Sequence, residues 1–478
     1  MNPWSFESSY RTLPSDFYAD ASPEVFTQPR IAVWNAPLAT TLGFTTDPDA
    51  DPALADAFLG QPWRAPTQPF AQAYAGHQFG HFTLLGDGRA VVLGERVHTD
   101  GTRVDIQLKG SGRTPFSRRG DGKASLGPML REFIISEAMH GLGIPTTRSL
   151  AVLSTGDLVH RQTLEPGAIL VRVAASHLRV GTFEFARAKD GKRLIPPLID
   201  YARSRHPCEA TSNNPALSLF DAVLTRQRAL MVHWMRVGFI HGVMNTDNMT
   251  ISGETIDYGP CAFMDRFNPH QVFSSIDEAG RYAYSQQPTI AQWNLARFAE
   301  TLLEFFAPTQ AEAIRLAEDR LDAFNHAFQD DWTEMMLAKI GLPCRPSYTP
   351  LVETLLDWMA KTRADFTGTF RGLSHRLEAP LPHDDTDFIQ WQQRWRQAIS
   401  EEGLALTAIK TKLEAMNPLY IPRNHRVEQA LAAAVDDGDF QPTHDLVRRL
   451  RTPYTAQMGG EADEAPGPDG PYRTFCGT

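Results

Sequence analysis

The chain has 478 residues, of which 42% are hydrophobic and 21% charged, and its formal net charge is −10. The length predicts about three domains, or one large domain with appendages. The composition is typical of a globular protein and excludes a disordered or low-complexity chain. The acidic balance argues against a general nucleic-acid or membrane-surface binder, because such proteins use basic charge to attract polyanions.

Nothing in the sequence suggests a membrane protein or an exported one. No stretch approaches about 18 uninterrupted apolar residues, so no membrane span is expected. The N-terminus has neither a basic region followed by an apolar run nor an Arg-rich amphipathic pattern, so we expect a cytoplasmic protein. The cysteines contain no C-x-x-C pair, which excludes a zinc ribbon and a disulfide scaffold; they are Cys208, Cys261, Cys344 and Cys476.

The first part of the chain is expected to be extended and the next part to form strands. Residues 1–70 are rich in proline, aspartate and aromatic residues without sustained periodicity, which predicts an extended segment laid over a neighbouring domain. From His81 onward, two strands are expected on either side of a glycine-rich turn at Gly86 and Gly88. In the third strand, VDIQLKG, apolar and polar residues alternate and place Lys109 on the polar face.

A helix is predicted over residues 126–141, where apolar residues recur at helical spacing. It carries two acidic residues, Glu132 and Glu137. Strand patterns follow at 149–154, 158–164 and 168–174, and a helical pattern then runs from about Ser218 to Gly238.

The rest of the chain is expected to be mainly helical. Residues 244–260 predict a loop and two short strands joined by a tight turn at Ser252–Gly253, the second strand ending in Asp257. Residues 292–450 are almost entirely helical in pattern. The tail from residue 458 is rich in glycine, proline and acidic residues and predicts a flexible arm.

Residues suited to nucleotide binding follow one another in the order of the protein-kinase-like fold. Gly86 and Gly88 would let the backbone approach phosphates without a Cβ clash, and Lys109 would supply positive charge to phosphate oxygens. Glu132, on the following helix, is placed to pair with Lys109 and hold its side chain. Each feature alone is a weak signal, and the order makes the set specific.

The second half of this set concerns a metal. His241 and Asn248 have the spacing of His and Asn in the kinase catalytic loop, and Asp257 begins an Asp-Tyr-Gly in the place of Asp-Phe-Gly. Asn248 and Asp257 would offer two hard oxygen ligands to Mg²⁺. However, Val243 stands where a kinase has its catalytic aspartate, so a site for ordinary phosphorylation is incomplete.

Segments from about residue 70 to the end resemble the selenoprotein O family, also called the YdiU family. These segments are AGHQFGHF, LGDGRA, QLKGSGRTPFSRRGDGKASLGPMLREF, VRVAASHLRVGTFEF, GFIHGVMNTDNM, DYGPCAFMD, QPTIAQWNL, MNPLYIPRNHRVEQAL and the terminal FCGT. The resemblance implies a pseudokinase fold and transfer of AMP from ATP to Ser, Thr or Tyr hydroxyls of proteins, with UMP transfer described for some bacterial members. It also implies a nucleotide inverted relative to that of a kinase, with the γ-phosphate buried and the α-phosphate presented.

The resemblance also implies roles for individual residues. Asp247 would be the proton acceptor, Asn248 a Mg²⁺ ligand and Asp257 a ligand of both metal and nucleotide. Contacts with ATP would come from Gly86, Gly88, Arg89, Lys109, Asp121, Gly122, Arg172 and Arg179. The implied cofactor is Mg²⁺, with Mn²⁺ as an alternative; ATP is the substrate, and the partners are proteins and not nucleic acid or membranes. Glu132 is preferred to Glu137 as the partner of Lys109 because it aligns with the family motif.

We therefore predict an α+β fold with a protein-kinase-like, pseudokinase core of two lobes and a helical C-terminal extension. The expected divisions are an N-terminal extended segment, an N-lobe, a C-lobe, a helical extension and a flexible tail, at 1–70, 71–155, 156–310, 311–450 and 451–478. The function we expect is Mg²⁺-dependent protein adenylylation. A kinase acting on a protein or small molecule, supported by Lys109, Asn248 and Asp257, and a nucleotide-binding scaffold without turnover remain as alternatives.

Three further features have simpler interpretations. His77 and His81 are four residues apart and suggest a metal pair, but no third ligand is evident. Arg118, Arg119 and Lys123 form a basic loop that is either solvated or in partial contact with phosphate. Cys476 stands where some members of the resembled family carry selenocysteine, and its thiol could form a regulatory disulfide with another cysteine. The sequence does not identify that partner: Cys261 is nearest the site in sequence, but a buried structural role is the favoured interpretation of this residue.

Overall fold

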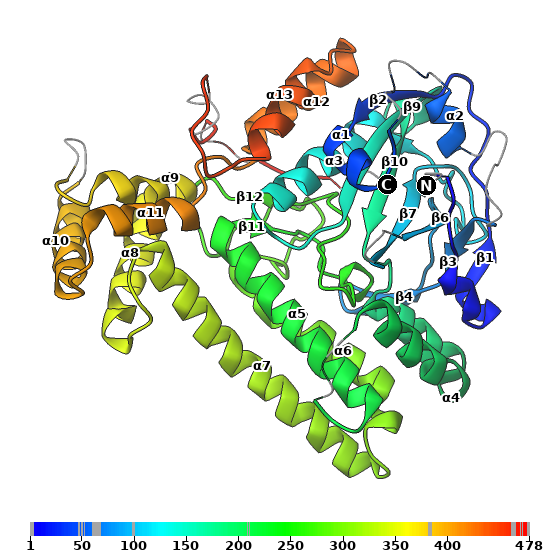
Figure 1. Ribbon diagram of the computed structural model, residues 1–478, viewed down its shortest axis with the longest axis horizontal. Helices are drawn as coiled ribbons and strands as arrows, with labels where there is room; N and C mark the ends of the chain where they lie inside the picture. Colours follow the sequence, from blue (N-terminus) through cyan, green and yellow to red (C-terminus); the bar gives the residue numbers. More distant parts are fainter. Residues whose placement is uncertain are drawn as a thin grey trace.

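The computed structural model of the chain describes all residues except 1–3, 46–47, 49–50, 52, 60–67, 98–100, 208, 210, 381–384, 460–464, 469, 471 and 476–478. Within the described residues the chain is mixed α and β, with an antiparallel sheet at one end and helices over most of the remainder (Figure 1). No helix in this described part combines the length and apolar composition that crossing a membrane requires.

The main sheet has eight antiparallel strands among the described residues, in the order β1-β3-β6-β7-β10-β9-β2, with β8 paired to β10. Their bounds are β1 Tyr18–Asp20, β2 Arg30–Trp34, β3 Phe70–Gln72, β6 Ala90–Val97, β7 Arg103–Lys109, β8 Ala124–Ser125, β9 Arg148–His160 and β10 Leu164–Ala174. Successive side chains of β7 point to opposite faces of the sheet. Ile106 and Leu108 are buried on one face, and Lys109 lies on the other.

The N-terminal segment is more structured than its sequence predicted. It supplies β1 and β2, which form the two edges of the sheet, and two short helices, α1 (Ala36–Thr41) and α2 (Leu54–Phe58). Its apolar side chains, such as Phe44 and Phe58, pack in one cluster with Ile106 and Leu108 of β7. This segment therefore covers one face of the sheet and completes its edges.

The glycine-rich segment 86–88 is not the turn of a hairpin, so that prediction was wrong. β5 (His81–Leu84) pairs with β4 (Ala75–Gln78), and the turn between them is formed by Phe79 and Gly80, both with positive φ. β6 pairs instead with β3 and β7. Residues 85–89 thus connect β5 to β6, and both strands lie on the same side of one longer hairpin whose other side consists of β3 and β4. Local turn residues do not reveal this topology.

Helix α3 (Leu126–Gly141) has the predicted bounds and packs on β9 and β10. β9 and β10 are longer than expected and form a hairpin, so the strand predicted at 158–164 is instead the end of β9 and its turn into β10. The strands β7, β10 and β9 and the helix α3 together form a rigid platform for side chains that point away from the N-terminal segment.

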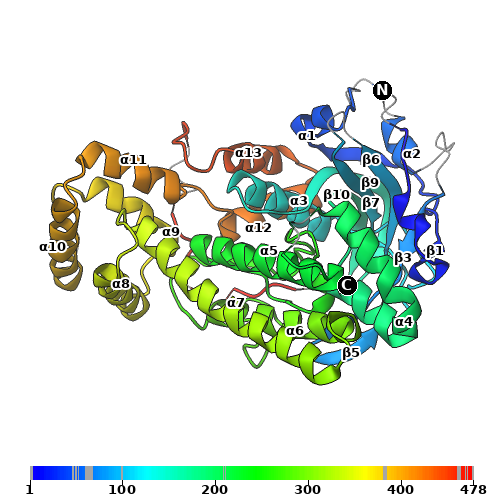
Figure 2. The same ribbon diagram turned by 60° about the horizontal axis from the view of Figure 1, so that its bottom comes forward.

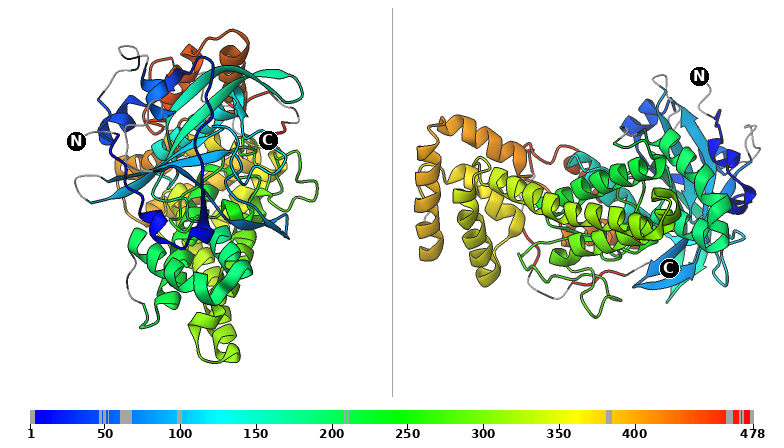
Figure 3. Two further views of the ribbon diagram at one scale, coloured as in Figure 1. Left: turned by 90° about the vertical axis from the view of Figure 1, so that its right-hand side faces the viewer. Right: turned by 90° about the horizontal axis from the view of Figure 1, so that it is seen from below.

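Long helices form the part of the molecule beside the sheet. They are α4 (Val180–Arg205), α5 (Pro215–Val237), α6 (Gln287–Phe306) and α7 (Gln310–Lys339). The sequence analysis missed α4, which contains Pro196 and Pro197 and bends at Asp190, where φ and ψ leave the helical region. Figure 3 shows α5, α6 and α7 running away from the sheet toward the far end of the molecule, whereas α4 stays beside the sheet (Figure 2).

The last helices form two groups. The group farthest from the sheet comprises α8 (Thr349–Thr362), α9 (Phe366–Gly372), α10 (Thr386–Glu401) and α11 (Leu406–Met416) (Figure 1). The chain then returns, and α12 (Asn424–Asp436) and α13 (Gln441–Leu450) pack against α3 (Figures 1 and 2).

A long irregular segment between α5 and α6 carries most of the predicted metal and catalytic residues. It contains the short pair β11 (Phe239–Ile240) and β12 (Ala262–Phe263) and the single-turn helix η3 (Thr246–Asn248). The two strands expected near residues 250 and 255 are not formed: Thr250 and Thr255 make only isolated bridges. The Thr250 hydroxyl donates to the Glu254 carbonyl at 2.6 Å, so a side chain closes this short turn instead.

The end of the described chain returns to this segment. The Thr474 N–H donates to the Phe273 carbonyl at 2.8 Å, and its hydroxyl donates to the Pro260 carbonyl. Residues of the segment predicted as a flexible arm are therefore hydrogen-bonded to the body of the molecule. Cys476 lies outside the described residues, and its redox role stays a prediction, as does the division of the chain into five parts.

Candidate functional site

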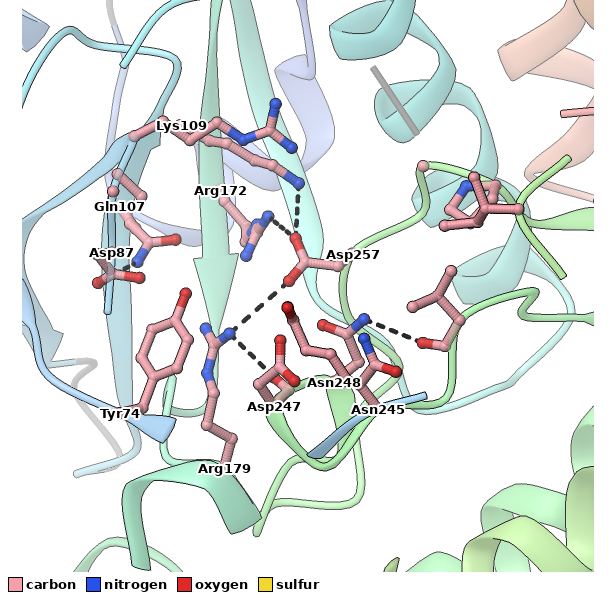
Figure 4. A pocket seen from close by; sticks show the side chains of 18 of the residues that line it. Tyr74, Asp87, Gln107, Lys109, Arg172, Arg179, Asn245, Asp247, Asn248 and Asp257 are labelled. Atoms are coloured by element: carbon pink, nitrogen blue, oxygen red, sulfur yellow. Dashed lines mark hydrogen bonds and ion pairs between the residues drawn. The ribbon is translucent and has the colours of Figure 1, made fainter. Parts of the chain in front are cut away.

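A cavity of about 360 Å³ lies between the sheet and the irregular segment that follows α5. Lining residues come from both sides and include eight of the predicted site residues. These are Gly88, Arg89, Lys109, Arg172, Arg179, Asp247, Asn248 and Asp257 (Figure 4). Residues separated by more than a hundred positions in the sequence thus converge on one cavity.

Lys109 joins the two sides of the cavity. At the end of β7, its Nζ lies 2.6 Å from Glu132 Oε2 on α3 and 2.6 Å from Asp257 Oδ1 on the irregular segment. Glu137, the competing partner, instead pairs with Arg148, whose Nε lies 2.6 Å from Glu137 Oε1. Glu132 therefore faces the cavity, whereas Glu137, about one and a half helical turns further along α3, holds this helix to β9.

Arg172 adds a second cation to the same carboxylates. It stands on β10 beside Gln107 of β7, and its Nη2 lies 2.8 Å from Glu132 Oε1 and 2.6 Å from Asp257 Oδ1. Burial alone would raise the pKa of Asp257, but Arg172, Lys109 and Arg179 outweigh it and hold that pKa well below its usual value. Asp257 is therefore ionised in its half-buried position on the cavity wall.

The backbone of Asp257 is strained. Its φ is 62°, in the left-handed region that a non-glycine residue seldom adopts, and such a conformation costs about 1–3 kcal/mol. The two cations at 2.6 Å from its carboxylate hold the residue in this conformation. Strain of this kind is characteristic of functional sites.

Arg179 lies at the start of α4 and faces the other side of the cavity. Its Nη1 donates to the Asp247 carbonyl at 3.0 Å, its Nε donates to the His177 carbonyl at 3.3 Å, and the guanidinium stacks 4.4 Å from the centre of the Tyr74 ring. Its Nη1 also lies 3.7 Å from Asp257 Oδ2. These contacts fix the guanidinium against one wall and leave further N–H groups for a ligand.

Asp247 has the features of a proton acceptor. The residue is buried, and within the described part of the chain its Oδ1 has no hydrogen-bond partner. Burial raises the pKa of Asp247 to about 7, against the opposing charge of Arg179. A carboxylate of this basicity can accept a proton from a hydroxyl near neutral pH.

The next residue offers a ligand atom for a cation. The Asn248 side-chain amide donates to the Val243 carbonyl at 3.0 Å, so its amide oxygen is the atom that can face a cation. With the carboxylate of Asp257 this provides two hard oxygen donors, which suit Mg²⁺ when phosphate oxygens and water complete the coordination. Among the described residues, no cluster of three or more His, Cys, Asp or Glu could hold a metal ion without such help.

Three predicted contact residues lie outside this cavity. Gly86, Asp121 and Gly122 line an adjoining, more open groove, which meets the cavity at Gly88 and Arg89. Asp121 pairs there with Arg161, whose Nη1 lies 2.8 Å from Asp121 Oδ2. The basic loop also lines this groove, through Arg118, Arg119 and Lys123.

Sequence reasoning missed several polar residues of the cavity wall, among them Tyr74, Asp87, Gln107 and Asn245. Two of them carried a usable signal: Asp87 stands between the two glycines, and Gln107 shares the polar face of β7 with Lys109. Asp87 Oδ2 accepts from the Gln72 backbone N–H at 3.1 Å and from the Gln107 amide at 3.2 Å. Burial raises the pKa of Asp87, which places a weakly acidic carboxyl on the sheet side of the cavity.

Cys261, considered as a redox partner, is fully buried, and its Sγ contacts the Tyr258 carbonyl oxygen at 3.2 Å. Burial raises the pKa of its thiol to about 12. A thiol of this acidity is almost entirely protonated at neutral pH and is a poor nucleophile in disulfide exchange.

Comparison with known proteins gives one consistent answer. The family model described as protein adenylyltransferase SelO matches residues 2–451. Proteins called protein nucleotidyltransferase YdiU are similar over 99% of this chain: that of Halalkalibacterium halodurans is 50% identical and covered over 98% of its length, and that of Alkaliphilus metalliredigens is 51% identical and covered over 98%. The one from Nitrosococcus oceani is 49% identical and covered over 97%. The chain belongs to the SelO family, as the match of the family model over nearly its whole length shows.

Proposed function

We propose that this protein is a Mg²⁺-dependent protein nucleotidyltransferase with a kinase-like core that transfers AMP from ATP to Ser, Thr or Tyr hydroxyls of other proteins. The names of its relatives support nucleotidyl transfer to proteins, and the name of its family supports adenylyl transfer. UTP as a donor of UMP is the alternative within the same reaction class.

The arrangement of elements supports a kinase-like core. A lysine on a sheet strand pairs with a glutamate on the helix that packs on the sheet, and a loop Asn and an Asp lie opposite. The kinase catalytic aspartate is replaced by Val243, which lines the cavity. Phosphorylation by a kinase mechanism therefore lacks its base at the usual place, whereas Asp247 offers one elsewhere.

The observation that carries the proposal is the positive charge around Asp257. Lys109 and Arg172 from the sheet and Arg179 from the start of α4 converge on this carboxylate, and all three cations are buried. An adenine ring needs apolar faces to stack against, whereas a terminal phosphate needs cationic donors. We place the γ-phosphate at Arg172 and Arg179, and the nucleoside in the groove beyond Gly88.

In this pose the α-phosphate lies beside Asn248 and Asp257, within reach of a protein hydroxyl that approaches Asp247. Asp247 accepts the hydroxyl proton while the oxygen bonds to the α-phosphorus, and the bond from the α-phosphorus to the bridging oxygen breaks to release pyrophosphate. Lys109 and the two arginines neutralise the charge that develops on the departing pyrophosphate. A Mg²⁺ ion held by Asn248 and Asp257 would supply further charge neutralisation.

The phosphate of ATP that is transferred to protein distinguishes the possible reactions. The protein is incubated with Mg²⁺, candidate protein substrates and ATP labelled at either the α- or the γ-phosphate, and acid-stable label on protein is measured. We expect α-label to be transferred and γ-label not to be, with transfer lost in Asp247→Asn while ATP still binds. Transfer of γ-label alone would establish a kinase, and absence of both labels would favour a nucleotide-binding scaffold. Labelled UTP in parallel gives the nucleotide preference.

A further inference from the structure

His77 does not act as the metal ligand that its spacing from His81 suggested. Its Nδ1 lies 2.5 Å from Glu184 Oε1 on α4, whereas His81 is exposed on β5. Among the described residues no metal-binding cluster contains either histidine. His77 belongs instead to a closed set of hydrogen bonds beside the cavity.

This set links three elements through three residues, which we call the Glu184 ring: His77 on β4, Glu184 on α4 and Thr246 on η3. The His77 backbone N–H donates to Thr246 Oγ1 at 2.7 Å, and the Thr246 hydroxyl donates to Glu184 Oε2 at 2.6 Å. Glu184 Oε1 then returns to the His77 imidazole. Each bond connects two different elements, so the ring fixes β4, α4 and η3 relative to one another.

The ring lies next to the proton acceptor. Thr246 precedes Asp247 in the single turn η3, and β4 passes directly over the Asp247 carboxylate. A Cβ placed on Gly76 would lie 2.2 Å from Asp247 Oδ1, and a Cβ on Gly181 of α4 would lie 2.1 Å from the Ala75 carbonyl oxygen. Glycine at both positions therefore allows the three backbones to meet around Asp247.

The chemistry of the ring is unusual for a purely structural contact. Glu184 is buried, and burial raises its pKa, so the carboxyl group costs folding free energy that an apolar residue would not. Buried polar groups of this kind, when fully hydrogen-bonded, fix one arrangement more sharply than apolar packing does. The arrangement fixed here is that of the loop carrying Asp247.

We propose that His77, Glu184 and Thr246 are positioning residues that hold Asp247 in line for proton transfer. The inference rests on the proposed function, because it assigns Asp247 as the base. None of the three ring residues lines the cavity, so the ring acts on the chemical step from behind, through the backbone of η3 and through the negative charge of Glu184 near Asp247. Loss of the ring lets the carboxylate shift, and a displacement of about 1 Å at a reacting group can reduce the rate about a hundredfold.

The test uses paired variants of the whole chain. Thr246→Val keeps the shape and removes the hydroxyl that joins all three elements, whereas Thr246→Ser keeps that hydroxyl. Glu184→Leu and Glu184→Gln form a second pair, because glutamine can still accept from Thr246 and contact His77. His81→Ala is the control on the same hairpin, with its side chain in solvent.

We expect Thr246→Val and Glu184→Leu each to lower kcat for transfer of α-label by about tenfold to a hundredfold, with KM and Kd for ATP within about twofold of wild type. The serine and glutamine variants should restore most of kcat. The double variant that combines Thr246→Val with Glu184→Leu should lose no more kcat than either single variant, because both substitutions break the same ring. His81→Ala should match the wild type.

Melting temperatures separate positioning from loss of fold. A variant that melts near the wild type and still loses kcat supports the proposal, and if Thr246→Val does not fold, the Glu184 pair decides alone. The proposal is overturned if folded Thr246→Val or Glu184→Leu retains wild-type kcat, if KM for ATP rises in parallel, or if the conservative variants fail to restore kcat. Failure of the wild type to transfer α-label would instead reject the proposed function.

Discussion

The inverted nucleotide can be tested at Arg179. Replacing this residue by alanine removes the guanidinium but not the start of α4, because the backbone N–H of Arg179 bonds to Thr182 Oγ1 at 3.3 Å and the Thr182 N–H bonds to the Arg179 carbonyl at 3.0 Å. If Arg179 holds the buried γ-phosphate, Arg179→Ala should weaken ATP far more than AMP. AMP lacks that phosphate and therefore loses little.

The expected loss of ATP affinity follows from the N–H groups of Arg179 that the protein itself does not use. A guanidinium has five N–H groups; the Nε group of Arg179 is used by His177 and one on Nη1 by Asp247. The remaining groups can donate to phosphate, and one hydrogen bond to a charged group contributes about 1.5–3 kcal/mol. This corresponds to a loss of about 10-fold to 150-fold in the Kd for ATP.

Calorimetric titration of ATP and AMP in the presence of Mg²⁺ measures both losses. Arg187→Ala is the matched control, because Arg187 lies on the same helix with a largely exposed side chain paired to Glu304 at 3.6 Å. Arg179→Lys should fall between wild type and alanine, since lysine keeps the charge without the planar fork. Equal losses for ATP and AMP would refute the assignment of Arg179 to the γ-phosphate and, with it, the inverted pose.

Four further outcomes are expected. Asp257→Asn, which suits the left-handed backbone, should lower transfer about a hundredfold or more, and Asn248→Ala should lower it less, as measured with α-labelled ATP. Transfer should rise with pH through about 7 and be about tenfold lower at pH 6 than on its plateau, because Asp247, with a pKa raised to about 7, accepts a proton only when ionised. Burial lowers the pKa of His206 to about 3, so the contribution of His206 to stability is complete above the unfolded value of about 6.5 and is lost as pH falls. In urea unfolding, the wild type should therefore lose about 2 kcal/mol more than His206→Gln on going to pH 5. Mn²⁺ should bind at least about tenfold more weakly without ATP than with it, as measured by electron paramagnetic resonance.

The parts of the site that the sequence predicted well are those set by local periodicity. Alternation within one strand placed Lys109 on the face opposite the apolar core, and helical spacing placed Glu132 on α3. α3 packs on β10, the strand that pairs with β7, so the side chains of Lys109 and Glu132 meet at 2.6 Å. Local pattern could not choose between Glu132 and Glu137; the structure does so through the register of β9, which brings Arg148 to Glu137.

The parts that the sequence could not predict depend on contacts between distant segments. The turn residues at 86–88 indicated a hairpin, but pairing with residues 70–78 decided the topology. The division between cavity and groove separates Gly86, Asp121 and Gly122 from the other predicted contacts, although they lie close in sequence to Gly88 and Lys109. The Glu184 ring was also hidden, because its members are far apart in the sequence and each is a common residue in its own element.

The ion pairs in the cavity explain why metal and nucleotide should bind together. Lys109 and Arg172 both lie 2.6 Å from the same oxygen of Asp257, so a cation approaching that oxygen meets two positive charges already in place. A triphosphate changes this balance, because its oxygens can take over both cations and free the carboxylate as a ligand. Glu132 remains to pair with Lys109 and Arg172 from the other side and keeps them from moving away. The charges of these four side chains are thus balanced among themselves before a ligand binds, and we expect a metal ion to bind at Asp257 only together with the nucleotide.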